Sequence, residues 1–296
     1  SAVVGKAIFT GKIINSMLTD AGILLIAILA LVKSASYAVK SIINVAKYFR
    51  MSEFFITFFI AGLVSIAPEL FIGINSALVG ATDIGLGTLI GSNIADLTII
   101  VGVVALVGRK IPISQSIIKN DLHFLAATSA PVLLLLDGSL SRMDGLFLVL
   151  IFLVYMYYSF RNEKVFSNAP KKEKEFFVKN LAVFIFSMSV LFVSSHFIVS
   201  SALELFDALY IPPIIAGLFL ISIGTTLPEL TFSLKAVLAK HKQIALGDIL
   251  GNVAIDSTLS IGIIALISPI TTNFTVFAIS ALFMSFAALL VVTLFT

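Results

Sequence analysis

Apolar residues dominate this chain in long runs. Nine runs approach the ~20 residues that a helix needs to cross the hydrocarbon of a bilayer. They fall at about 20–48, 54–79, 84–107, 118–137, 143–160, 181–205, 214–239, 244–267 and 274–296. The short alternating segments that are typical of a membrane barrel are not visible. The pattern therefore predicts an all-α polytopic membrane protein.

Composition supports this class and excludes several others. The 296 residues are 59% hydrophobic and 12% charged, whereas a soluble domain carries about 25% charged residues. The absence of cysteine excludes disulfides, thiolate metal sites and iron–sulfur clusters. With a net charge of +3 and no basic stripe, we expect no nucleic-acid partner. No organic cofactor and no obligatory protein partner is evident.

Lysine and arginine fall unevenly on the two sides of the predicted membrane. Thirteen lie on one side, and only Lys6, Lys12 and Arg142 lie on the other. Because cytoplasmic loops carry the excess of positive charge, the N-terminus is predicted to be external and the basic linker 161–180 cytoplasmic. We expect a multi-pass protein of the cell membrane.

The two halves of the chain match each other at an offset of 160 positions. Residues 61–110 and 221–270 share 13 identities without a gap. Five spans in the first unit make the second unit enter the membrane from the opposite side, so the repeats have inverted topology, as in many secondary transporters. The matched positions include Pro68/Pro228, Glu69/Glu229, Gly87/Gly247, Gly91/Gly251 and Asp96/Asp256. The glycines, four residues apart, allow close helix packing.

The repeat sets the expected boundaries of the chain's parts. Residues 1–19 are predicted to form an N-terminal interfacial segment, and 20–160 the first repeat of about five helices. The linker 161–180 precedes the second repeat, 181–296. The second unit has one span fewer, so a tenth helix is expected outside the given sequence.

Four matched acids lie near the centres of their predicted spans: Glu69, Asp96, Glu229 and Asp256. An ionised carboxylate at that depth costs about 2.5–3.5 kcal/mol, or on the order of 10 kcal/mol for four. Those spans contain no arginine and a single lysine, Lys235. Bound cations or protons are therefore expected to neutralise the acids.

Neutral oxygen ligands accompany the acids. Ser65, Thr225 and Thr226 lie one turn before the glutamates, and Ser92 and Asn252 lie one turn before the aspartates. Proline precedes each glutamate and removes a helical hydrogen bond. An all-oxygen set suits a hard cation such as Ca²⁺, whereas zinc and copper prefer nitrogen or sulfur.

Three further charged groups lie outside this set. Asp248 is about eight residues, or roughly 12 Å, from the middle of its span, which favours a place at the mouth of a pathway. The first span is interrupted by Lys33 and Lys40, seven residues apart. These lysines either line a polar helix face, extend their ammonium groups to the interface or pair with acids.

These residues resemble the calcium/cation antiporter superfamily, and are most similar to a prokaryotic proton/calcium or sodium/calcium exchanger. The sequence 222–230, SIGTTLPEL, is close to the signature of that family's second repeat. Residues 67–70, APEL, and 91–96, GSNIAD, are similar to its first-repeat motifs.

The resemblance implies a cation site where the second and third spans of each repeat cross. Glu69 and Glu229 would be the central calcium ligands, with the backbone carbonyls of Ser65 and Thr225. Sodium-coupled members also use the carbonyls at Gly62 and Ser222. They use, in addition, the positions of Ser92, Asn252, Asp96 and Asp256. The long first span of each half would slide across the core.

The counter-ion is left between two alternatives. Where sodium-coupled relatives offer Thr-Ser in the first repeat, this chain has Ser65-Ile66, and it has Asp96 where they tend to carry asparagine. The four carboxylates carry two more negative charges than one calcium ion neutralises, and protons are able to neutralise the remaining two. We therefore expect Ca²⁺ export in exchange for H⁺, with Na⁺/Ca²⁺ exchange as the alternative.

Functions of other classes fit less well. The pair Asp96 and Asp256 also permits an intramembrane aspartyl protease, but a protease has no use for the duplicated Pro-Glu. A passive channel remains open. An ATP-driven pump is disfavoured because the chain has no phosphate-binding Gly-rich loop. The protein is thus expected to be a transporter of inorganic cations in a lipid bilayer, not an enzyme.

Overall fold

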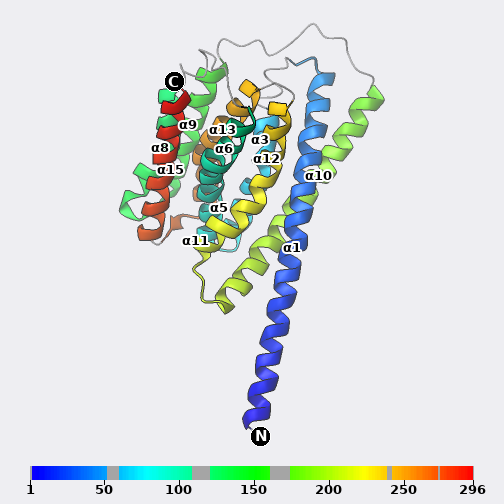
Figure 1. Ribbon diagram of the computed structural model, residues 1–296, viewed down its shortest axis with the longest axis vertical. Coiled ribbons are helices and arrows are strands. Elements are labelled where there is room, and N and C mark those ends of the chain that lie inside the picture. Colours follow the sequence, from blue (N-terminus) through cyan, green and yellow to red (C-terminus); the bar gives the residue numbers. More distant parts are fainter. Residues whose placement is uncertain are drawn as a thin grey trace.

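The computed structural model describes residues 2–51, 60–108, 121–160, 174–238, 242–272 and 274–295, and these are almost entirely helical (Figure 1). The first half contains α1 (Ala2–Tyr48), α3 (Gly62–Ser65), α4 (Ala67–Leu78), α5 (Thr82–Ala95), η2 (Asp96–Ile100), α6 (Val101–Gly108), α8 (Asp121–Leu134), η3 (Leu135–Asp137), β1 (Ser139–Leu140) and α9 (Arg142–Phe160). The second half contains α10 (Lys174–Ala208), α11 (Pro213–Ile215), η4 (Ala216–Ile221), α12 (Ser222–Leu238), α13 (Lys242–Ile255), η5 (Asp256–Ser260), α14 (Ile261–Ile267), β2 (Ile270–Thr271) and α15 (Phe274–Phe295).

The helices coincide with the apolar runs of the sequence. Six of them in the described residues are long and apolar enough to cross a membrane. The second and fourth predicted spans are described only from residues 60 and 121. The linker predicted at 161–180 is described only from residue 174, where α10 begins, so its first part lies outside the described residues.

The repeat of the sequence is also a repeat of the backbone. Helix α1 ends at Tyr48 and α10 at Ala208, and α4 ends at Leu78 and α12 at Leu238. The π-helical turns η2 and η5 begin at Asp96 and Asp256. Each pair is 160 residues apart, so the two units share helix boundaries as well as side chains.

Two long helices, α1 and α10, lie side by side along one edge of the bundle (Figure 1). Helix α1 has 47 residues and α10 has 35, which correspond to roughly 70 and 50 Å. Helix α1 continues through the predicted boundary at residue 19 without a break, and its N-terminal end extends beyond the other helices in Figure 1. That residues 1–19 lie at the interface stays a prediction.

The distribution of polar and apolar side chains is the reverse of that in a soluble protein. Large apolar side chains face outward on the peripheral helices, among them Ile26 on α1 (69% exposed) and Leu282 on α15 (66% exposed). Serine, threonine, asparagine and acidic side chains are buried in the centre. A lipid-facing exterior around a polar interior is the arrangement that hydrocarbon favours.

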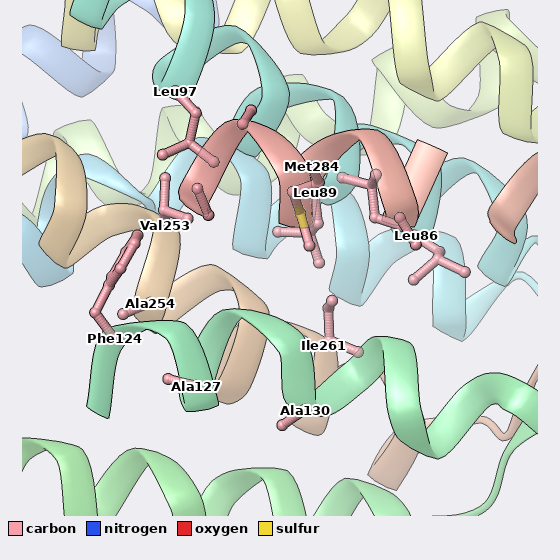
Figure 2. Packing of buried hydrophobic residues seen from close by; sticks show 14 of the residues in the cluster. Leu86, Leu89, Leu97, Phe124, Ala127, Ala130, Val253, Ala254, Ile261 and Met284 are labelled. Atoms are coloured by element: carbon pink, nitrogen blue, oxygen red, sulfur yellow. The ribbon is translucent and has the colours of Figure 1, made fainter. Parts of the chain in front are cut away.

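The apolar core lies between α5, α8 and the helices of the second unit (Figure 2). Helix α8 presents the small residues Ala127 and Ala130 toward it, next to Phe124. Leu89 of α5 and Met284 of α15 lie opposite and are also buried. This packing joins helices of both units into one body.

Glycines let the two units approach each other at backbone distance. A Cβ on Gly87 would collide with the carbonyl oxygen of Ile214, and one on Gly217 would collide with that of Ile84. Gly91 lies likewise against the carbonyl of Leu218. The close packing predicted for Gly87 and Gly91 is therefore confirmed, and it brings α5 directly against η4 and the start of α12.

A short antiparallel ribbon also connects the halves. Ser139 of β1 pairs with Thr271 of β2, and Leu140 pairs with Ile270. The ribbon joins the loop before α9 to the loop before α15, so backbone pairing links the first unit to the second.

Candidate functional site

The two signature glutamates have different helical surroundings. In the first unit the helix is interrupted at Ile66 (φ −77°, ψ −3°), and α4 restarts with Pro68 in its first turn and Glu69 directly after it. In the second unit α12 runs through Pro228 to Glu229 without a break. Glu69 is fully buried and Glu229 is 3% exposed. Both side chains therefore lie inside the protein and not in lipid.

The two aspartates occupy equivalent turns. Asp96 opens the π-helical turn η2 and Asp256 opens η5, and each is 1% exposed. A π turn inserts one extra residue into the helix and changes the direction of the side chains around it, and such turns occur often at functional sites. The same distortion at the same acid in both units indicates a shared role.

The four acids interact with one another. Asp96 and Glu229, from different units, are close enough for their charges to interact. Glu69 is close enough to Asp96, Glu229 and Asp256 for their charges to interact. In the described part of the chain, no three acidic or histidine side chains converge tightly enough to form a metal cluster alone. The acids are thus an electrostatic group, and any cation among them needs neutral oxygens as well.

Several oxygens of these acids have no partner. Both carboxylate oxygens of Glu69 and of Asp96, and Oε2 of Glu229, are buried without a hydrogen-bond partner among the described residues. Asp256 differs, because Ser260 donates to its Oδ1 at 2.7 Å. Buried polar atoms are normally hydrogen-bonded, and a buried unpaired carboxylate is strongly destabilising. This arrangement is suited to binding a positive species.

A chain of hydrogen bonds crosses between the units at Asn252. Its Nδ2 donates to Glu229 Oε1 at 3.0 Å, and its Oδ1 lies 3.1 Å from the hydroxyl of Ser65. That hydroxyl is shared with the carbonyl oxygen of Gly62 at 2.9 Å. Ser65 of the first unit is therefore connected to Glu229 of the second through one amide.

The remaining predicted ligands direct their protons to their own helices. Thr225 and Thr226 both donate to the carbonyl of Ser222 at 3.0 Å, and Ser92 donates to Leu89. Thr225 also lies beside the Glu69 carboxyl group. With their protons directed elsewhere, these hydroxyls present lone pairs to the surroundings.

A second hydrogen bond between the units was not predicted from the sequence. Asn93 Nδ2 donates to Ser257 Oγ at 3.1 Å, beside the two aspartates. Ser260, the partner of Asp256, was also missed. The available signal was spacing: Asn93 lies three residues before Asp96, and Ser260 four residues after Asp256.

A cavity of about 330 Å³ leads to this group. It lies between α1 and α12, and Ser65, Glu229 and Asp248 line it together with Lys40 and Lys235. Two predicted calcium ligands, Ser65 and Glu229, therefore line the same cavity as Asp248.

Comparisons with known proteins agree over nearly the whole chain. The sodium/calcium exchanger protein family matches residues 19–161 and 179–296. The putative antiporter CaxA of Alkalimonas amylolytica is 28% identical over 265 residues, which are 86% of this chain and 82% of that protein.

Two solved exchangers share the fold. The sodium–calcium exchanger NCX_Mj superposes with a TM-score of 0.66 at 22% identity, over 93% of this chain and 89% of its own. The H⁺/Ca²⁺ exchanger CAX gives a TM-score of 0.72 at 19% identity, over 92% and 73%. The predicted fold, an all-α polytopic membrane protein with inverted-topology repeats, is confirmed. Since the family match covers both halves of the chain, this protein belongs to the sodium/calcium exchanger family and is a secondary transporter, not an enzyme.

Proposed function

We propose that this transporter exports Ca²⁺ in exchange for H⁺, at a site between its two units near the middle of the membrane. The observation that carries the proposal is the buried proximity of Asp96 and Glu229, near a Glu69 carboxyl group whose oxygens have no hydrogen-bond partner among the described residues. Such a group needs positive charge, and both a metal ion and protons supply it.

Calcium fits the ligands that surround these acids. Ca²⁺ takes six to eight oxygens at about 2.3–2.6 Å, and Glu69 and Glu229 provide the two charges that balance it. The neutral oxygens come from the groups around the signature helices: the carbonyls of Gly62, Ser65, Ser222 and Thr225, the hydroxyls of Thr226 and Ser92, and the amide of Asn252.

Protons fit the pair of Asp96 and Glu229. Two ionised carboxylates that lie near each other in the protein interior repel, so a proton on one of them stabilises the pair. Calcium binds to Glu229 only after that proton has left, because metal ligands must be deprotonated. The two ions therefore compete for one carboxylate, and this competition makes an exchange cycle.

Sodium is the second candidate for the counter-ion. The second unit has the complete hydroxyl pair, Thr225 and Thr226, directed at one carbonyl, and this favours a small monovalent cation there. The first unit has Ile66 where the second has Thr226. The broken match in the first unit leads us to prefer protons.

Alternating access is assigned to the long helices. Helices α1 and α10 pack along each other at one edge of the bundle, while the acids are carried by α4, η2, α12 and η5. We infer that the pair slides across the acid-bearing core and opens it to each side in turn. We propose that the protein lies in the cell membrane with the α1 C-terminal end in the cytoplasm and the N-terminus outside, and the excess of basic residues in the loops predicted on one side supports this orientation.

The test is calcium flux in proteoliposomes under an imposed pH gradient or an imposed sodium gradient. We expect ⁴⁵Ca²⁺ uptake to follow the pH gradient, and Glu69→Gln and Glu229→Gln each to reduce it to background. Uptake that follows only the sodium gradient would reject proton coupling. Full uptake in both glutamine variants would show that Glu69 and Glu229 do not form the calcium site.

A further inference from the structure

Asp248 is a buried acid that the proposed exchange cycle does not use. It lies in the first half of α13, is 5% exposed, and its Oδ2 atom has no hydrogen-bond partner among the described residues. Its counterpart in the first unit, 160 residues earlier, is Thr88. The carboxylate is thus present in one unit only.

The side chain lines the cavity that leads to Glu229. The cavity holds about 330 Å³, with Asp248, Tyr37, Lys40 and Lys235 among its walls. A volume of this size accommodates a hydrated ion together with several waters, since one water occupies about 30 Å³ in the liquid. An acid in such a wall is in contact with whatever ion passes through.

A row of oxygens connects Asp248 with the core. Asp248, Asn252 and Asp256 follow each other at intervals of four residues, so they lie on one face of the helix. Asn252 holds Glu229 by its 3.0 Å hydrogen bond, and Asp248 is close enough to Asp96 for their charges to interact. The row leads from the cavity to the acids.

The equivalent row in the first unit begins without a charge. It consists of Thr88, Ser92 and Asp96, and the Thr88 hydroxyl donates to its own helix at Ile84 over 2.8 Å. The inverted repeat directs this second row toward the opposite side of the membrane. The two rows of polar side chains that lead to the core therefore differ by one carboxylate.

We propose that Asp248 is a staging site for the divalent cation, between the cavity and Glu229, on one side of the membrane only. That the ion continues to Glu229 rests on the proposed function. The binding of a cation at Asp248 does not. Lys40 and Lys235 lie in the same cavity, and their positive charges repel a cation bound at Asp248. This repulsion shortens the residence time of the cation, as transport requires a site that releases its ion.

Terbium luminescence tests the binding directly. The detergent-solubilised full chain is titrated with Tb³⁺, a hard cation whose emission is excited through a nearby tyrosine. Tyr37 lines the cavity, so the wild type is expected to give sensitised emission that Tyr37→Phe removes. Asp248→Thr introduces the residue that the first unit has at the equivalent position. This variant is expected to raise the half-saturating Tb³⁺ concentration by about ten-fold or more. An unchanged titration in this variant would overturn the proposal.

A second pair of variants separates this inference from the proposed function. Glu69→Gln is expected to keep the Tyr37-sensitised signal and to lose calcium flux. If Glu69→Gln keeps its flux while Asp248→Thr loses the signal, the staging site holds and the exchange site is wrong. The exposed acid Glu204 on α10 supplies the matched control, Glu204→Gln, which should change neither measurement.

Discussion

Asn252 donates a hydrogen bond of 3.0 Å to Glu229, and so one amide determines where the second signature carboxylate points. Its match in the first unit, Ser92, donates to Leu89 of its own helix instead. The Asn252 amide also accepts from Ser65 of the opposite unit. The repeat is therefore symmetric in its acids and asymmetric in the groups that hold them.

Replacing Asn252 by alanine should raise the calcium concentration that half-saturates transport by about 10- to 100-fold. A hydrogen bond to a charged group contributes about 1.5–3 kcal/mol, and here it holds a proposed ligand in place. The concentration dependence of ⁴⁵Ca²⁺ flux measures the change. Asn75, an equally buried asparagine that donates to Ser195 at 2.8 Å, is the control. If Asn75→Ala shifts the half-saturation as much, the effect is general loosening of the fold.

Calcium should stabilise the wild type but not Glu69→Gln. A ligand at 100 times its Kd stabilises the folded state by about 2.7 kcal/mol, and the glutamine side chain lacks the charge that the ion needs. Thermal unfolding in detergent, with and without calcium, provides the measurement. An equal calcium-induced rise in Tm in both proteins would show that Glu69 is not a calcium ligand.

Replacing Asp96 by asparagine should separate proton transport from calcium transport. The variant keeps Glu69 and Glu229 for the metal but loses the carboxyl group that shares a proton with Glu229. We expect calcium–calcium exchange to continue while uptake driven by a pH gradient falls at least ten-fold. Parallel loss of both activities would instead make Asp96 a calcium ligand.

Gly91→Ala should destabilise the folded protein by about 1–3 kcal/mol, the usual cost of overpacking. The new Cβ would meet the backbone of Leu218 and, at 2.7 Å, the hydroxyl of Ser222. Gly102→Ala is the control on the same span. Nothing lies within 4 Å of the Cβ it would add, and alanine is preferred over glycine in a helix by up to about 1 kcal/mol. Equal Tm values for both variants would show that the close contact is not needed.

The acids, the repeat and the helices were predictable because each leaves a direct trace in the sequence. Glu69, Asp96, Glu229 and Asp256 are charges in apolar runs, and their common offset implies a common structure. The structure places all four in the interior and in mutual interaction. That these four acids bind cations stays a prediction.

Contacts between the units were not predictable, because they depend on how helices cross. The offset aligns Asn252 with Ser92, yet only the longer amide reaches across to Ser65. The π turns at Asp96 and Asp256 have no local composition that marks them, and the break at Ile66 has no equivalent at Thr226. Such details depend on packing between helices that are distant in the sequence, rather than on local preference.

The ribbon of β1 and β2 has a consequence for how the protein is able to move. Because Leu140 is paired with Ile270, backbone pairing joins the two units at this point, and separating them there would break that pairing. In the proposed cycle, the acid-bearing core therefore stays fixed. Helices α1 and α10, which are not part of the ribbon, move across it and expose one face of the core as they cover the other.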